Sequence, residues 1–111
     1  MPPSAPLLKG TLDVLVLKAL SWGPMHGFEI TVWLEGHSGG FLAVDDGALY
    51  QALHRMEARG LIRADWGITD NNRRARYYSV TAAGRVYLRR ASATLTRYAH
   101  TVVAILATAR R

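Results

Sequence analysis

Residues 46–62 read DGALYQALHRMEARGLI, and this stretch decides the fold. Asp45, just before it, is a good N-cap, because its carboxylate can accept the free backbone amides at the start of a helix. Gly60 supplies a C-terminal stop. The apolar side chains between these signals are spaced four and three apart, as on one buried stripe: Leu49, Leu53 and Met56. The sequence therefore predicts a helix over about residues 46–59 with a polar outer face.

Two shorter helices are predicted upstream. Apolar residues recur on one face from Thr11 to Leu20, and the run ends at Gly23 and Pro24. A second helix is expected over residues 26–35, ended by Gly36 together with Gly39 and Gly40, and residues 41–44 are compatible with a short strand. Three prolines among residues 1–6 argue against regular structure there, so we expect a flexible arm.

A hairpin and a long helix are predicted downstream. Residues 61–66 and 75–80 are rich in aliphatic and aromatic side chains and flank a polar tip. Thr81 then caps a helix that we extend to about residue 109. The order predicts a mainly α fold with a small β-wing: an arm over 1–6, a winged helix-turn-helix domain over 7–80 and a C-terminal dimerisation helix over 81–111.

Positive charge is concentrated in the second part of the chain. The sequence has 14 lysines and arginines against eight acids, for a formal net charge of +6. No acid follows Asp70, whereas residues 71–111 contain nine arginines. Such segregation favours an anionic partner, either nucleic acid or a membrane surface.

Composition argues against several other classes of protein. Without cysteine the chain has no disulfides or thiolate sites, so we expect a cytoplasmic location. The longest uncharged stretch, residues 98–109, is about half the roughly 20 residues that a membrane-spanning helix needs. The four histidines lie far apart without paired acids, so we predict no metal site, no cofactor and no enzymatic activity.

The polar face of the helix over 46–59 is the first candidate site. Its side chains can pair with base edges in a DNA groove, and two small residues would let the backbone approach closely: Gly47, Ala48, Tyr50, Gln51, His54 and Arg55. The alternative is the ordinary solvated face of an amphipathic helix.

The hairpin tip is the second candidate site. It places three arginines within four positions beside asparagine: Asn72, Arg73, Arg74 and Arg76. Arginine pairs with phosphate oxygens and enters narrow minor grooves, so the tip is typical of a DNA backbone contact. The alternative is a solvated basic turn.

The last helix carries a seam with heptad spacing. Its members are Leu88, Ala91, Leu95, Tyr98, Val102, Ile105 and Ala109. Because the short upstream domain cannot bury all of this seam, we expect a homodimer whose two copies read a palindromic operator. The alternative is a helix that folds back on its own domain.

The chain resembles the PadR family of winged-helix repressors in three runs taken in order. They are GTLDVLVLKALSWGPMHG over 10–27, DGALYQALHRMEARGLI over 46–62 and RYYSVTAAGRVYL over 76–88, within a resemblance that spans about residues 7–109. The single C-terminal helix is similar to the family's smaller subgroup, in which that helix packs beside the first helix of the partner.

This resemblance implies roles for particular residues. Tyr50 and its helical neighbours would bind DNA, the tip at Asn72 to Arg74 would touch backbone or minor groove, and Lys9 and Thr11 would contact phosphates. Gln51 stands where many members carry proline, so a base-reading role for it stays open. The resemblance also implies a site for a flat aromatic effector near Leu12, Leu15 and Tyr98, although the chain has no tryptophan after Trp66.

The leading hypothesis is a sequence-specific regulator of transcription that binds double-stranded DNA as a homodimer. On this hypothesis it acts as a repressor that a small aromatic effector releases. One alternative is a protein interaction module that docks onto an acidic partner, and another is a small-molecule sensor without DNA contacts. The concentration of positive charge in the second part of the chain argues against the sensor, because a sensor without DNA contacts would leave the basic wing unused.

Overall fold

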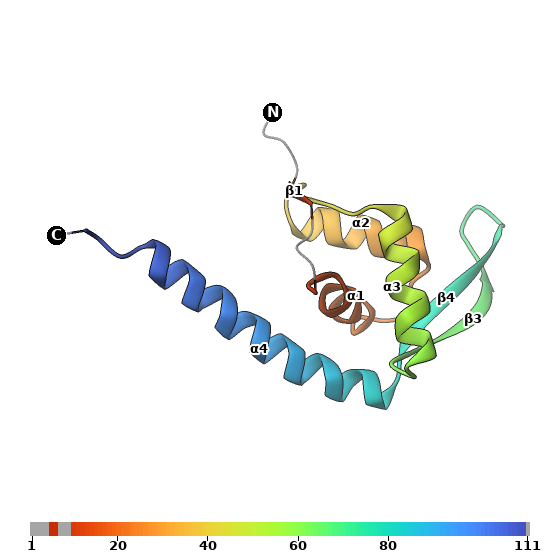
Figure 1. Cartoon of the computed structure of the whole chain (residues 1–111). Coiled ribbons are helices and arrows are strands. Elements are labelled where there is room, and N and C mark those ends of the chain that lie inside the picture. Colours follow the sequence, from red (N-terminus) through yellow and green to blue (C-terminus); the bar gives the residue numbers. More distant parts are fainter. Residues whose placement is uncertain (1–4, 7–9, 111) are drawn as a thin grey trace.

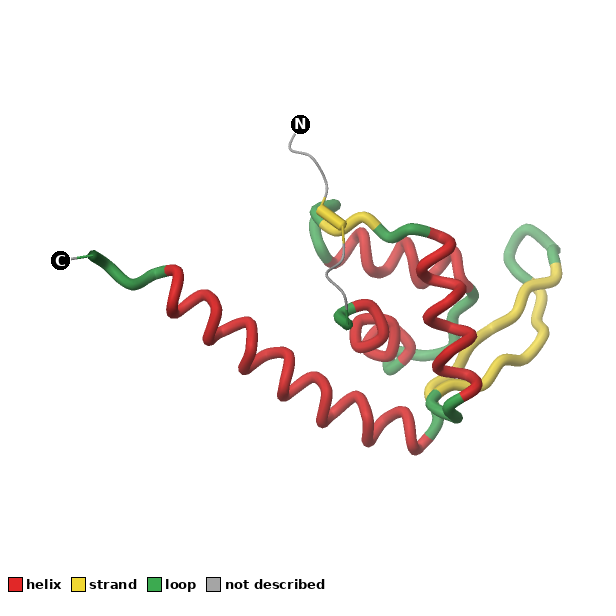
Figure 2. The backbone as a smooth tube through the Cα atoms, viewed as in Figure 1, coloured by secondary structure: helices red, strands yellow, loops and turns green. Residues whose placement is uncertain are grey.

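The computed structural model describes residues 5–6 and 10–110. Three helices form a small bundle, a β-hairpin extends from one side of it, and a long final helix projects away beneath the first helix (Figures 1 and 2). The elements in order are β1 (Ala5–Pro6), α1 (Leu12–Leu20), α2 (Gly27–His37), β2 (Leu42–Ala43), α3 (Asp46–Ala58), β3 (Ile62–Ile68), β4 (Arg74–Val80) and α4 (Ala82–Leu106). This is the winged-helix order that the sequence predicts.

The core lies among the three bundle helices and the base of the hairpin. Helix α1 is central and packs against α2, α3, α4 and β4. The largest fully buried side chains come from α1, α2, α3 and the start of β3: Val16, Leu17, Leu20, Ile30, Leu49, Leu53, Met56 and Ile62. Removing this apolar surface from water stabilises the bundle and fixes which face of α3 is turned outward.

Side-chain caps set where the helices begin. Oδ2 of Asp45 accepts a hydrogen bond from the backbone N–H of Ala48 at 2.9 Å, which confirms the predicted start of α3. Oγ1 of Thr81 accepts one from Gly84 at 3.0 Å, which confirms the start of α4. At α2 the cap is reciprocal, since His26 Nδ1 accepts from the N–H of Glu29 while the Glu29 carboxylate accepts from the N–H of His26.

The hairpin forms the wing and is tied to the bundle at its base. Strands β3 and β4 are antiparallel, with Ile62 opposite Val80 at the base and Ile68 opposite Arg74 near the tip. The loop between α1 and α2 pairs with β4 through two backbone hydrogen bonds, at 3.1 and 2.8 Å, that join Met25 and Tyr78. The base of the wing is therefore fixed, whereas its outer half extends beyond the core (Figure 1).

Helix α4 joins the core through its first turn. Thr81 Oγ1 donates a hydrogen bond to the carbonyl of Gly60 at 2.7 Å. Gly84 lies so close to the backbone at Leu61 that a Cβ on Gly84 would overlap the carbonyl oxygen of Leu61. The next turns of α4 pack on α1, and from Thr96 onward every described residue of the chain is exposed.

Two expectations about the ends of helices are wrong in detail. Helix α2 continues through Gly36 to His37, although the left-handed backbone after it does occur at two of the expected glycines, Gly39 and Gly40. Helix α4 ends at Leu106, about three residues before the expected end, so Ala109 lies outside it.

The arm over residues 1–6 also differs from expectation. Ala5 and Pro6 form a two-residue strand that pairs in parallel with Leu42 and Ala43, whereas residues 1–4 lie outside the described part of the chain. Proline is compatible with a sheet edge, because no ladder hydrogen bond has to be donated there. The short strand expected within residues 41–44 is confirmed.

Within residues 5–6 and 10–110, no helix has the length and apolar character needed to cross a membrane.

Candidate nucleic-acid interface

The outward face of α3 is accessible to solvent along its whole length. All of the side chains predicted to face DNA are exposed: Gly47, Ala48, Tyr50, Gln51, His54 and Arg55. The opposite face is buried in the core through Leu49, Ala52, Leu53 and Met56. The division between the two faces follows the periodicity that the sequence predicts.

Tyr50 projects from α3 toward the start of α2. Its ring lies against Gly27, where a Cβ would stand 2.5 Å from the phenolic oxygen. Gly27 thus leaves the space that the tyrosine occupies. Sequence reasoning missed this role for Gly27, although the residue ends the first run that carries the family resemblance.

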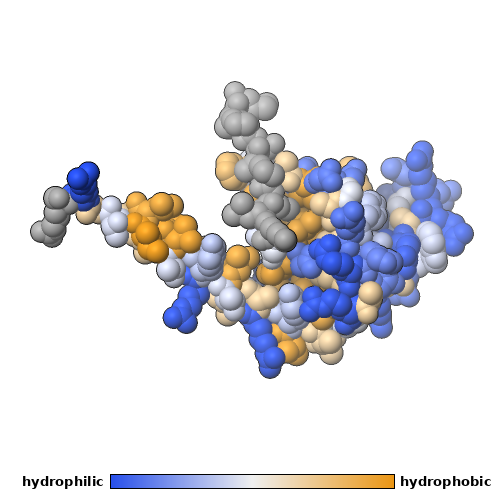
Figure 3. Space-filling view, in the orientation of Figure 1, coloured by the Kyte–Doolittle hydropathy of each residue, from blue (hydrophilic) through white to orange (hydrophobic). Residues whose placement is uncertain are grey.

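A hollow joins α3 to the wing. It lies between the start of α2, Tyr50 of α3 and the outer half of the hairpin, with Trp66, Arg73, Arg74 and Arg76 on the wing side. The hydrophilic surface gathers on this side of the molecule, over α3 and the wing (Figure 3). Of the two sites predicted from sequence, the structure therefore brings Tyr50 of α3 together with three arginines of the wing, whereas the other predicted α3 residues do not line this hollow.

Two of the predicted arginines are paired within the chain. Arg55 Nη2 lies 2.7 Å from Asp13 Oδ1, which links α3 to α1, and Arg76 Nη2 lies 3.0 Å from Glu57 Oε2, which links the wing to α3. Neither Arg73 nor Arg74 forms an ion pair within residues 10–110. Of the arginines predicted to face DNA, those at the tip are therefore the ones whose charge is not already paired within the described residues.

The tip itself is a closed turn. The N–H of Thr69 donates to the carbonyl of Arg73 at 2.8 Å, and the N–H of Asn72 donates to the carbonyl of Thr69 at the same distance. Asn72 has a φ of 60°, a left-handed conformation that asparagine tolerates better than most residues. This turn projects the side chains of Asn72 and Arg73 away from the core.

The tyrosines at the base of the wing stay protonated. Burial raises the pKa of the Tyr78 phenol, and this effect outweighs Arg76, which lowers it. Desolvation also raises the pKa of Tyr77, with further contributions from Glu29 and Asp70. The ring of Tyr78, which lies under Arg76, is therefore neutral at neutral pH, as is the ring of Tyr77, which lies beside His26.

The predicted effector site is only partly assembled. Tyr98 borders a groove between the start of α1 and α4, together with Gly10, Val14, Tyr87, Arg90, Ala91, Thr94 and Leu95. Leu12 and Leu15 do not line this groove, because both pack against the core. Thr11 is the half-buried N-cap of α1, and Lys9 lies outside the described residues.

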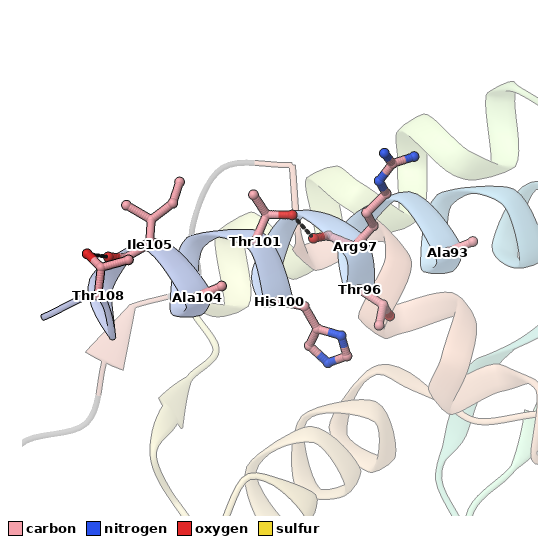
Figure 4. A pocket seen from close by; sticks show the side chains of 8 residues that line it. All are labelled: Ala93, Thr96, Arg97, His100, Thr101, Ala104, Ile105 and Thr108. Carbon is pink, nitrogen blue, oxygen red and sulfur yellow. Dashed lines mark hydrogen bonds between the residues drawn. The ribbon is translucent and has the colours of Figure 1, made fainter.

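The far end of α4 is not covered by any other element among residues 5–6 and 10–110. The shallow strip drawn in Figure 4 is formed by side chains of α4 and the residues just after it, and Thr101 Oγ1 donates to the carbonyl of Arg97 at 2.8 Å. Apolar surface also gathers at this end (Figure 3), and Val103, Ile105 and Leu106 are strongly exposed. Of the predicted dimer seam, Leu88, Ala91 and Leu95 are half-buried in their own domain, whereas Tyr98, Val102 and Ile105 are exposed.

Within residues 10–110, no three metal-binding side chains lie close enough together to hold a metal ion.

The helix-turn-helix formed by α2 and α3, with a β-hairpin beside it, defines a winged-helix protein. The crystal structure of a PadR-like transcriptional regulator from Bacillus cereus is similar, with a TM-score of 0.78 and 26% sequence identity over 92% of this chain and 97% of that one. The sequence model of the transcriptional regulator PadR-like family matches residues 16–90. The chain therefore belongs to this family of transcriptional regulators, and the prediction of a regulator rather than an enzyme is confirmed.

Two other relatives extend the comparison. Transcriptional regulator Rv3488 of Mycobacterium tuberculosis is 40% identical over 64 residues, and the match covers 58% of this chain and 56% of that protein. The structure of Bacillus subtilis PadR in complex with operator DNA has a TM-score of 0.65 and 22% identity, over 72% of this chain and 45% of that one. This last likeness is one of fold.

Proposed function

We propose that this transcriptional regulator binds double-stranded DNA with α3 in the major groove and the wing on the flanking backbone or minor groove. The observation that carries the proposal is the single exposed surface on which Tyr50 of α3 meets the arginines of the wing. The concentration of positive charge after Asp70 supports it, since duplex DNA carries one negative charge per about 1.7 Å of its axis.

Different residues would serve affinity and specificity. Gln51 and His54 are exposed, and we assign them to base edges, whereas Gly47 and Ala48 would let the helix enter the groove closely. Arg73 and Asn72 would contact phosphates, which position a protein without specifying sequence. Thr11, at the start of α1, would add a further phosphate contact.

We infer that the working form is a homodimer joined through α4. Tyr98, Val102 and Ile105 continue the seam beyond the domain of their own chain, and their exposure in a single copy supports a second copy as their cover. A dimer would hold two copies of α3 over two half-sites of a palindrome, about one helical turn apart.

The regulator would repress by occluding a promoter. A flat aromatic ligand in the groove beside Tyr98 would touch both α1 and α4, and so it could alter the geometry of the dimer. Release of DNA by such a ligand belongs to the proposal.

Duplex binding measured by fluorescence anisotropy at several salt concentrations tests the proposal. The probe is a duplex enriched from fragments of the source genome by the purified protein. We expect log affinity to fall steeply with log salt, and Arg73→Ala to reduce the slope by about one. Arg55→Ala is the matched control: because its guanidinium is already paired with Asp13, it should change the slope less.

An affinity that is flat across salt concentrations, or no binding at micromolar protein, would overturn the proposal. Recovery of an acidic protein partner that survives nuclease treatment, together with absent DNA binding, would favour a protein-docking module instead.

A further inference from the structure

The outer half of the wing carries an exposed apolar pair beside its arginines. Residues paired across an antiparallel hairpin share one face, and residues two apart along a strand return to that face. Trp66 lies opposite Arg76, and Ile68 lies opposite Arg74, so these four side chains share a face. The same face is buried at the base, but Trp66 and Ile68 are 63% and 61% exposed.

The two arginines on this face are held differently. Arg76 is paired with Glu57 at 3.0 Å. The guanidinium carbon of Arg74 instead lies 4.6 Å from the centroid of the Trp66 ring, within the range of a cation–π contact. Within residues 10–110 Arg74 has no carboxylate partner, so the indole is the group that restrains its guanidinium.

A stacked guanidinium keeps its hydrogen-bonding edge free. Its planar face lies on the ring, while the N–H groups point outward in the plane and remain available to acceptors. A narrow, A·T-rich minor groove offers acceptor atoms at its floor and an enhanced negative potential, and it attracts arginine in particular. An arginine that is already oriented loses less conformational freedom on entering such a groove.

We infer that Trp66 is a positioning residue that holds Arg74 for insertion into a narrow minor groove beside the site read by α3. This inference rests on the proposed function. It assigns the wing a preference for A·T-rich flanking sequence, and it gives the exposed Trp66 a function.

The test measures flank preference rather than affinity alone. Two probes share the centre of the duplex enriched by the wild-type protein, and their flanks are an A·T tract in one and G·C-rich sequence in the other. We expect the wild-type protein to prefer the A·T flanks, and Trp66→Ala to lose most of this preference, by roughly fivefold to tenfold. Trp66→Phe keeps an aromatic face and should retain most of it.

Three further variants separate positioning from other roles. Arg74→Lys keeps the charge but removes the planar group, so it should lose the preference as Trp66→Ala does. In an Arg74→Ala background, Trp66→Ala should have no further effect on flank preference. Trp22→Ala removes another exposed tryptophan, away from the wing, and should leave the preference intact.

Specific outcomes would overturn the inference. One is a Trp66→Ala protein that keeps the wild-type preference, and another is an additive loss in the Arg74→Ala background, which would make Trp66 an independent contact. Wild-type binding without any flank preference removes the inference but leaves the proposed function standing. A wild-type protein that binds neither duplex removes both.

Discussion

A missing side chain determines how the last helix joins the bundle. Gly84 lies in the first turn of α4, where a Cβ would overlap the carbonyl oxygen of Leu61. Gly36, in the last turn of α2, has open space where its Cβ would be. A side chain therefore cannot be accommodated at Gly84, whereas one can be accommodated at Gly36.

Alanine at these two positions should change stability in opposite directions. We expect Gly84→Ala to lower the free energy of unfolding by about 1–3 kcal/mol, because the α4 root must shift to admit the methyl group. Gly36→Ala should raise it by about 0.5–1 kcal/mol through helix propensity and a less flexible unfolded chain. Urea denaturation followed by circular dichroism measures both, and a neutral Gly84→Ala would contradict the packing described above.

The buried phenol of Tyr78 predicts a loss of stability in alkali. Burial raises the pKa of Tyr78 above its unfolded value of 10.0, so above that pH the native chain holds more protons than the unfolded chain. The free energy of unfolding then falls as pH rises through the folded pKa. We expect Tyr78→Phe to lose less stability than the wild-type protein between about pH 9 and about pH 11, measured by thermal denaturation.

Contacts between residues close in sequence could be predicted, whereas contacts between distant residues could not. The caps Asp45 and Thr81 were predictable because their partners lie three residues away. The pairing of Arg55 with Asp13 joins residues 42 apart, and no local pattern signals it. The stacking of Arg74 on Trp66 depends on strand register, which the long polar tip of the hairpin left undetermined.

At the level of elements, α3 depends on its N-terminal cap. Asp45 satisfies the N–H of Ala48, and we expect Asp45→Ala to cost about 1 kcal/mol of stability. Asp46→Ala is the matched control: that side chain makes no capping hydrogen bond and should cost a few tenths of a kcal/mol through the helix dipole. Chemical denaturation of the two variants compares them, and equal losses would mean that charge alone matters here.

The order and type of the elements followed from periodicity, but their ends did not. Helix α2 passes through Gly36 because the left-handed turn comes later, at Gly39 and Gly40. Its start agrees with the expected one, but histidine is an unusual N-cap, so the sequence does not signal the reciprocal pair that His26 forms with Glu29. The strand at Ala5 and Pro6 was unexpected because its partner lies more than 30 residues away.

At the level of the whole molecule, the exposed end of α4 predicts self-association. We expect Ile105→Glu to convert a dimer to a monomer, because a carboxylate would have to be buried in an apolar contact. Thr96→Glu is the control, since it adds the same charge to the same helix away from the seam. Sedimentation equilibrium gives the mass, and a monomeric wild-type protein at working concentration would rule out the dimer.

The same substitution should weaken binding to a palindromic duplex by more than about tenfold, since each half-site would then be bound independently. A half-site duplex should show little change. If Ile105→Glu weakened binding to both duplexes equally, α4 would serve the DNA surface in some other way than by pairing two copies.

Because α4 is long, a small change in its direction would displace its free end by a large distance. The 25 residues of α4 span about 37 Å at 1.5 Å per residue. The end of α4 that is fixed to the core is the turn in which Gly84 lies against Leu61. A tilt of about 5° at this fixed end would move the C-terminal end of α4 by about 3 Å, a displacement comparable with the rise of one base pair. A molecule that bound between α1 and α4 near this fixed end would therefore displace the far end of α4 by more than it displaced the fixed end.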